Sequence, residues 1–234
     1  MDVHKPKPWH SVREFLKEYL IIVVGVLTAL GAEQVAENLH EQKIASEARE
    51  SVRAEVRENL WWLKRRERRE ACVGRQIDEL DEVLDAARHG RPYPTPRHLE
   101  RVYHVKLTSL RWEANAQAGR ASLFTTREQR NLGNMYYTTE QFGHYQDLEE
   151  DVWSKLDAIV GLDRLTPSEI DAFALLLAQA RYQHSMIDLS LRRAQQWAAA
   201  LQLKAENPNL VEMPTASVVS TACASISMAP SEPS

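Results

Sequence analysis

Histidine and glutamate residues that lie four apart are the first candidates for chemistry in this sequence. Glu100 and His104 form one such pair, and Glu140 and His144 form another. On a helix, residues four apart share a face, so each pair could supply two ligands to a metal ion. Di-iron carboxylate bundles use a Glu-x-x-His spacing instead, with further glutamates on partner helices. We therefore interpret both pairs as exposed helix contacts, and we expect no metal and no cofactor.

His184 interrupts an otherwise apolar series and is the most distinctive single residue. A functional interpretation makes it a ligand or a pH switch. The alternative, which we favour, is a core histidine that hydrogen-bonds across to a neighbouring helix, or a polar residue that fixes helix register. The sequence has no Gly-rich phosphate loop, no G-x-S-x-G and no H-E-x-x-H. We expect no catalytic residues and predict that the protein is not an enzyme.

The cysteines and the basic run are also weak indicators of function. Cys72 and Cys223 are the two cysteines, too few for a disulfide scaffold and without a metal-binding CxxC. The stretch "WWLKRRERRE" (Trp61–Glu70) mixes aromatic and basic residues, which suggests a patch for nucleic acid or lipid headgroups. Glutamates within and before this stretch offset its charge, and the net charge of the chain is −4. We therefore predict a solvated face with Trp packing and no nucleic-acid partner, although Trp with Arg is also common in protein interfaces.

The elements that would position these residues begin with an apolar segment. The uncharged run Tyr19–Ala32 is short for a membrane, but Phe15–Ala36 would be about 33 Å long as a helix, enough for a hydrocarbon core of roughly 30 Å. A cleaved signal peptide would explain the run and the small residues of Ala29–Gly31, but Glu14 and Glu18 are unusual before such a run. A buried soluble helix is the other alternative, but an ordinary surface helix would show a polar face, and Leu20–Leu30 has none. We favour a transmembrane helix over both alternatives.

Lysine and arginine flank this segment unequally. Lys5, Lys7, Arg13 and Lys17 precede it, whereas few basic residues follow it closely. By the positive-inside rule the N-terminus is cytoplasmic and the remainder lies outside, which in a bacterial cell means the periplasm. We therefore predict a single-pass protein of the bacterial inner membrane.

Two stretches carry a family resemblance. "REFLKEYLIIVVGVLTALGAEQVAENLH" (Arg13–His40) resembles the start of an uncharacterised bacterial family of single-pass, N-terminally anchored helical proteins, with an EFLKE-type lead, an IV-x-GVL-x-AL run and a following EQ. "LRWEANAQAG" (Leu110–Gly119) is similar to a later part of these proteins. The resemblance implies membrane topology and helicity. It implies no activity and no catalytic residues.

A long helix should follow the apolar segment, because only Gly74 interrupts Glu33–His89. Its apolar frame steps by three and four residues but has polar members in the middle, so either that part is solvated or the chain turns near Glu70–Gly74. Gly90 should end the helix, before the stiff connector Arg91–Pro96. The frame consists of Val52, Val56, Asn59, Leu63, Arg66, Glu70, Val73, Ile77, Leu80, Leu84 and Ala87.

Capping signals divide the rest of the chain into further helices. We expect a short helix over Arg97–Leu107, and another over Leu110–Ala118 with Ser109 as its N-cap. Capping boxes at Thr126–Gln129 and Thr166–Glu169 should start two long helices, the first ending near Val160 before Gly161. The last helix has the clearest seam: Ile170, Phe173, Leu177, Ala180, His184, Ile187, Leu191, Ala194, Ala198 and Leu201.

The predicted fold is therefore all-α: a transmembrane helix followed by an elongated antiparallel helical bundle with coiled-coil-like seams. The predicted parts are a cytoplasmic segment (1–14), the transmembrane helix (15–36), the extracytoplasmic bundle (37–206) and a disordered tail (207–234). As function we predict a non-enzymatic accessory, scaffold or interaction subunit of a membrane complex, with other membrane proteins or further copies of itself as partners. A ligand-sensing helical module is the alternative, and a metal-dependent enzyme is a more distant one.

Overall fold

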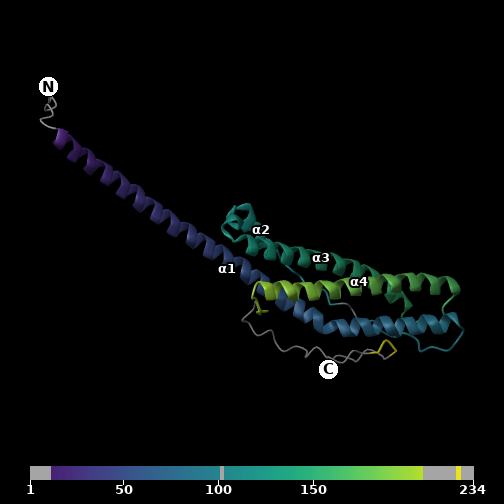
Figure 1. The fold of residues 1–234 in the computed structure, drawn as a ribbon. Helices are drawn as coiled ribbons and strands as arrows, with labels where there is room; N and C mark the ends of the chain where they lie inside the picture. The colour runs from purple at the N-terminus through teal and green to yellow at the C-terminus, as the bar shows by residue number, and fades with distance from the viewer. Residues whose placement is uncertain (1–11, 101–102, 208–224, 228–234) are drawn as a thin grey trace, which may run out of the picture. The chain divides into compact units, whose positions relative to one another are not determined.

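The structure is a computed structural model that describes residues 12–100, 103–207 and 225–227. Within these residues it contains helices and no strand, which confirms the all-α class (Figure 1). The helices are α1 (Val12–Arg88), α2 (Leu110–Gln117), α3 (Thr126–Leu156) and α4 (Pro167–Ala200), with short 3₁₀ helices η1 (Arg120–Leu123) and η2 (Asp157–Ile159).

Helix α1 runs without a break through Gly74, so the chain does not turn near Glu70–Gly74. One glycine costs a helix about 1 kcal/mol, which burial of the flanking apolar residues easily offsets. The helix ends where predicted. Gly90 adopts a positive φ of 64°, and the N–H of Arg91 returns to the carbonyl of Ala86 at 2.8 Å.

The chain divides into two compact units, residues 1–49 and residues 50–234. The described residues of the first unit form the N-terminal part of α1, and most of their large apolar side chains are exposed. This helix is long and apolar enough to cross a membrane, and none of its apolar window is buried. Of the predicted cytoplasmic segment 1–14, residues 1–11 lie outside the described residues, including Lys5 and Lys7, and residues 12–14 belong to α1. The exposed large apolar residues between positions 15 and 39 are Phe15, Leu16, Tyr19, Leu20, Ile21, Ile22, Val24, Val26, Leu27, Leu30, Val35 and Leu39.

The seam of α1 in the second unit is buried along its length, including its polar middle. Asn59 and Arg66 are fully buried, and the Glu70 side chain is only 12% exposed. The prediction of a solvated middle or a turn was therefore wrong. Periodicity identified the correct face, but the partners that make burial of these polar groups possible come from elsewhere in the chain.

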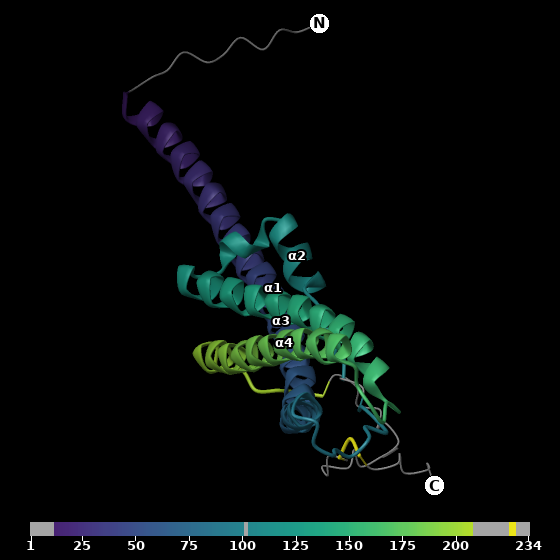
Figure 2. The same cartoon turned by 90° about the vertical axis from the view of Figure 1, so that its right-hand side faces the viewer.

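Helices α3 and α4 lie side by side and are joined by residues 157–166 (Figures 1 and 2). The capping box predicted at Thr166–Glu169 is present at the start of α4. The box of α3 lies one residue earlier than predicted, with Thr125 as N-cap and Glu128 as its partner. A carboxylate is a stronger acceptor than an amide at the positive end of a helix, which favours Glu128 over Gln129.

The core of the second unit is built from α1, α3 and α4. All the predicted seam residues of α4 are buried except His184, which is partly exposed. One apolar cluster unites the C-terminal part of α1, the end of α3 and the start of α4. It contains Val73, Ile77, Leu80, Val83, Leu84, Leu99, Val152, Trp153, Leu156, Ile159, Phe173, Leu177, Ala180 and Ile226.

The helix predicted over Arg97–Leu107 does not form, and the described residues of this segment are non-helical. Buried side-chain amides satisfy the backbone instead. Gln146 of α3 accepts from the N–H of Val105 at 2.8 Å and donates to its carbonyl at 2.9 Å. Asn59 of α1 holds Thr108 in the same two-sided way, at 3.1 and 2.8 Å. These amides provide the hydrogen bonds that a helix would otherwise provide.

The predicted disordered tail lies outside the described residues except for 207 and 225–227. Ser225–Ser227 differ from that expectation. Ile226 is 2% exposed, and its N–H donates to Glu79 of α1 at 2.7 Å. Its carbonyl accepts from the backbone N–H groups of Arg97, at 2.7 Å, and of His98. Ile226 therefore belongs to the core of the second unit, and the partly exposed Ser225 and Ser227 flank it.

Candidate functional site

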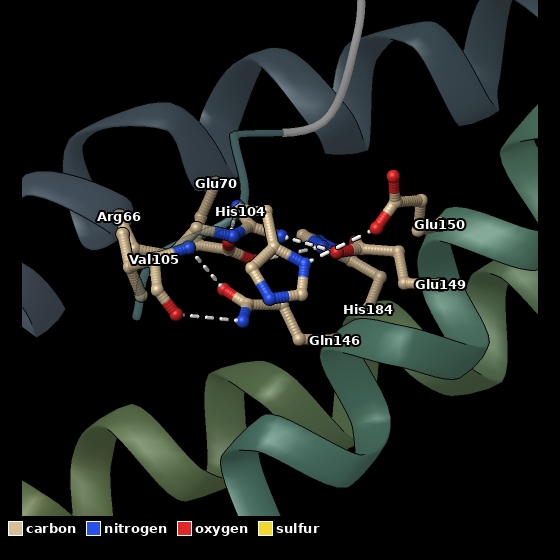
Figure 3. A network of polar contacts seen from close by, with 8 residues as sticks. All are labelled: Arg66, Glu70, His104, Val105, Gln146, Glu149, Glu150 and His184. Carbon is tan, nitrogen blue, oxygen red and sulfur yellow. Dashed lines mark hydrogen bonds and ion pairs between the residues drawn. The ribbon is translucent and has the colours of Figure 1, made fainter. Parts of the chain in front are cut away.

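A cluster of four ionisable side chains lies at the centre of the second unit (Figure 3). Arg66 and Glu70 come from adjacent turns of α1, Glu149 comes from α3 and His184 from α4. We call these four residues the buried charge cluster. It joins the three long helices at one point, and it accounts for two of the three polar residues of the α1 seam, Arg66 and Glu70, and for the single polar residue of the α4 seam.

Arg66 contacts both carboxylates of the buried charge cluster. Its side chain and that of Glu149 are both 0% exposed, and its Nη2 donates to Glu149 Oε2 at 2.7 Å. Its Nη1 donates to Glu70 on the next turn of α1. The second oxygen of Glu70 lies 2.9 Å from Nδ1 of His184, which forms an ion pair when the imidazole is protonated. The chain of contacts therefore runs from α3 through α1 to α4.

Burial and charge oppose each other in this cluster. Burial raises the pKa of Glu149, and the neighbouring Arg66 only partly offsets it. The contact with Glu70 raises the pKa of His184, although burial of the imidazole acts in the opposite direction. With His184 protonated, two cations face two carboxylates. The arrangement is therefore a charge-balanced link between helices, and it leaves Arg66 Nε and Glu149 Oε1 without a hydrogen-bond partner among the described residues.

A second buried carboxylate, Glu55, anchors α2. It accepts from the backbone N–H of Arg111 at 2.9 Å and of Trp112 at 3.1 Å, and from the hydroxyl of Tyr136 at 2.7 Å. Ser109 is the N-cap residue as predicted, but its side chain makes no capping hydrogen bond, and Glu55 fills that role. Burial, followed by this contact with Glu55, strongly raises the pKa of Tyr136.

From the sequence, the glutamates before the basic run, Glu55 among them, were interpreted only as charges that offset it. The spacing of Glu55 was an available signal, because it lies three residues after Val52 and four before Asn59, on the face that proved to be buried. Glu149 had a similar signal on α3, three residues before Val152. A carboxylate on an apolar helix face requires a partner when it is buried.

The two Glu/His pairs have different surroundings. Glu100 and His104 are themselves non-helical, as are the described residues beside them. Glu100 pairs with Arg69 at 2.9 Å, and His104 lies 3.2 Å from Glu150. Glu140 and His144 are both exposed on α3. No group of three or more histidine, cysteine, aspartate or glutamate residues in the described chain is arranged to hold a metal ion.

The basic stretch Trp61–Glu70 is not a uniform solvated face, since Arg66 is buried. Trp61 and Trp62 are half-buried, and their rings pack edge to face with centroids 4.6 Å apart. The guanidinium of Arg65 lies 4.9 Å from the centre of the Trp61 ring and 6.0 Å from that of Tyr103. Three aromatic rings around one arginine make this a compact surface of the kind enriched in protein interfaces.

Cys72 is buried on α1, at 3% exposure, and is disulfide-bonded. Cys223, the other cysteine of the sequence, lies outside the described residues. Two cysteines are too few for a disulfide scaffold, as predicted, but a single bond was not among the sequence-based predictions.

Comparison of the chain with models of protein families, with curated proteins and with solved structures found no match. The resemblance to an uncharacterised family of anchored helical proteins therefore remains a prediction.

Proposed function

We propose that this chain is a single-pass membrane protein whose helical unit acts, without catalysis, as an accessory, scaffold or interaction subunit of a membrane complex. The observation that carries the proposal is the exposed apolar stretch of α1. It satisfies the length and composition of a membrane span, and none of its apolar window is buried.

Exposure of the apolar side chains of this stretch to water would be energetically unfavourable. The run Tyr19–Ala32 contains eight Leu, Ile or Val residues. At about −0.3 to −0.6 kcal/mol each, their insertion into a bilayer gains on the order of 2.5–5 kcal/mol. A buried soluble helix would need these side chains to pack within the chain, and the described residues provide no such cover. A membrane is the environment that suits them.

The disulfide at Cys72 supports an extracytoplasmic location for the helical unit. Disulfides persist in oxidising compartments such as the bacterial periplasm and are rare in the cytosol. The positive-inside rule leads to the same topology, because the basic residues concentrate before the apolar run. The proposed orientation is a cytoplasmic N-terminus with the helical unit in the periplasm of a bacterial cell.

A scaffold needs a stiff framework and a surface that partners can recognise. The buried charge cluster links α1, α3 and α4 at one point, which supports stiffness. The half-buried rings of Trp61 and Trp62, with Arg65 beside them, offer the aromatic and arginine composition that interfaces favour. Together they support a role in protein contact.

The test is extraction from native membranes in a mild detergent, followed by measurement of the assembly mass, its subunit composition and its metal content. A large assembly with other chains in fixed stoichiometry is the expected result. A lone monomer or dimer would reject the subunit proposal. Recovery without detergent, in a form that lacks about the first 31 residues, would show a cleaved signal peptide instead of an anchor.

Interface variants connect the assembly to the surface proposed for it. Arg65→Ala removes the guanidinium that lies among the three rings. Arg68→Ala, on an exposed position of the same helix, is the matched control. Loss of co-purifying chains with Arg65→Ala and their retention with Arg68→Ala is expected, and equal retention by both variants would contradict the assignment of this surface.

A further inference from the structure

An open cavity of about 500 Å³ lies between α2, the start of α3 and the segment that precedes α2. Its volume is within the range of about 300–1,000 Å³ that is typical of small-molecule sites. The entire cavity belongs to the second unit. It is lined by Leu107, Thr108, Ser109, Trp112, Glu113, Gly133, Tyr136, Tyr137, Thr139 and Glu140.

Aromatic rings form much of the cavity wall. Trp112 of α2 stacks on Tyr136 of α3, with ring centroids 5.3 Å apart and planes 14° from parallel. Tyr137, next along α3, is 59% exposed. The faces of such rings carry negative potential and attract organic cations, as the aromatic cages that bind quaternary ammonium groups illustrate.

The charge of the lining has one sign. Glu113 and Glu140 contribute carboxylates from two different helices, and none of the described lining residues is Lys or Arg. Glu113 accepts a hydrogen bond from Ser109, whereas Glu140 makes no ion pair or hydrogen bond with a described residue. The carboxylate of Glu55, which accepts from the Tyr136 hydroxyl, adds to the same potential, and the nearby Arg111 guanidinium, which lies 4.0 Å from Glu58, offsets it in part. The cavity is therefore complementary to a cation.

The wall is also held in place before any ligand arrives. Glu55 fixes the first turn of α2 through the N–H groups of Arg111 and Trp112, and it fixes Tyr136 through its hydroxyl. Such preorganisation lowers the entropy cost of binding. Gly133, one turn before Tyr136 on α3, leaves room, because a Cβ built there would meet no atom within 4 Å.

We propose that this cavity binds a small aliphatic amine, with its ammonium groups against the Trp112, Tyr136 and Tyr137 rings and the carboxylates of Glu113 and Glu140. The amine can be a free polyamine or the amine-bearing headgroup of a lipid, because both present the same ammonium chemistry. The site requires neither membrane insertion nor a protein partner. It also assigns a role to the "LRWEANAQAG" stretch, which supplies Trp112 and Glu113.

The test is isothermal titration calorimetry of the full chain in detergent, with spermidine and with phosphoethanolamine as separate probes at low salt. Gly133→Leu fills the cavity from a position with open space, so the helix should tolerate it. Gly143→Leu is the matched control: Gly143 is also in α3, also has nothing within 4 Å of a built Cβ, and does not line the cavity. Circular dichroism establishes that both variants are folded.

Binding of either probe that is lost in Gly133→Leu and kept in Gly143→Leu is the expected result, and the probe that binds identifies the source of the amine. Glu140→Gln should weaken that binding about fivefold, and added salt should weaken binding to the unaltered chain, because a partly exposed ion pair is screened. Absence of heat with both probes would overturn the proposal. Binding that Gly133→Leu leaves unchanged would overturn it as well.

Discussion

Removal of Arg66 should destabilise the second unit far more than removal of Arg66 together with Glu149. Arg66 and Glu149 are both 0% exposed and 2.7 Å apart, and Arg66 also pairs with Glu70. Arg66→Met keeps the length of the side chain but leaves carboxylates buried without their cation. Breaking a buried pair in this way costs about 3–5 kcal/mol.

The double variant Arg66→Met/Glu149→Leu replaces the pair with apolar groups. Such a replacement is often neutral or stabilising, because the cost of desolvating both charges disappears. Glu70 then keeps His184 as its partner at 2.9 Å. We expect the double variant to lie within about 1 kcal/mol of the unaltered chain, so that Glu149→Leu restores most of what Arg66→Met removes.

Urea unfolding followed by circular dichroism measures this difference. With a slope of roughly 2 kcal/mol per molar urea, Arg66→Met should lower the unfolding midpoint by about 1.5–2.5 M. Arg68→Met, at an exposed position two residues away, is the control and should change stability by less than about 0.5 kcal/mol. The reasoning is refuted if Arg66→Met costs as little as Arg68→Met, or if the double variant is less stable than Arg66→Met.

Four further outcomes are expected. The pKa of His184 is raised in the folded chain. The stability that this shift contributes is fully present below the unfolded pKa of about 6.5 and is lost as pH rises through the folded pKa. Unfolding free energies measured across this range should therefore fall as pH rises, and His184→Gln should flatten the fall. Glu55→Gln should lower the free energy of unfolding by about 1–3 kcal/mol, because a neutral amide is a weaker acceptor for the N–H groups of the first turn of α2. The fluorescence of Trp112 should change if this turn loosens. Unchanged stability would contradict the role of Glu55 as an anchor. Reduction of the Cys72 disulfide should lower the free energy of unfolding by about 2–4 kcal/mol. Urea unfolding with and without reductant measures this difference, and an equal unfolding midpoint in both would show that the bond contributes nothing to stability. Val24→Arg should weaken membrane insertion by about 3 kcal/mol, measured as the fraction recovered with membranes after carbonate wash, whereas full retention would argue against a span.

The sequence by itself determined the features that depend on neighbours within a few turns. The seam of α4 and the capping box of Thr166 and Glu169 were predicted residue by residue, because helical periodicity and capping act over three or four positions. The C-terminal end of α1 at Gly90 and the apolar stretch before residue 40 followed from the same local rules. None of these predictions required knowledge of which helices meet.

Only the tertiary structure decided where the polar groups of the seams find partners. Arg66 meets Glu149, 83 positions away along the sequence, and Val105 meets Gln146, 41 positions away. A polar residue on an apolar helix face predicts a solvated position or a turn until such a partner is known. A connector is likewise predicted to be helical until side-chain amides are found to satisfy the hydrogen bonds of its backbone. The free energy of a buried polar group depends on whether it is paired, and pairing across a helical unit is a property of the fold that local spacing does not contain.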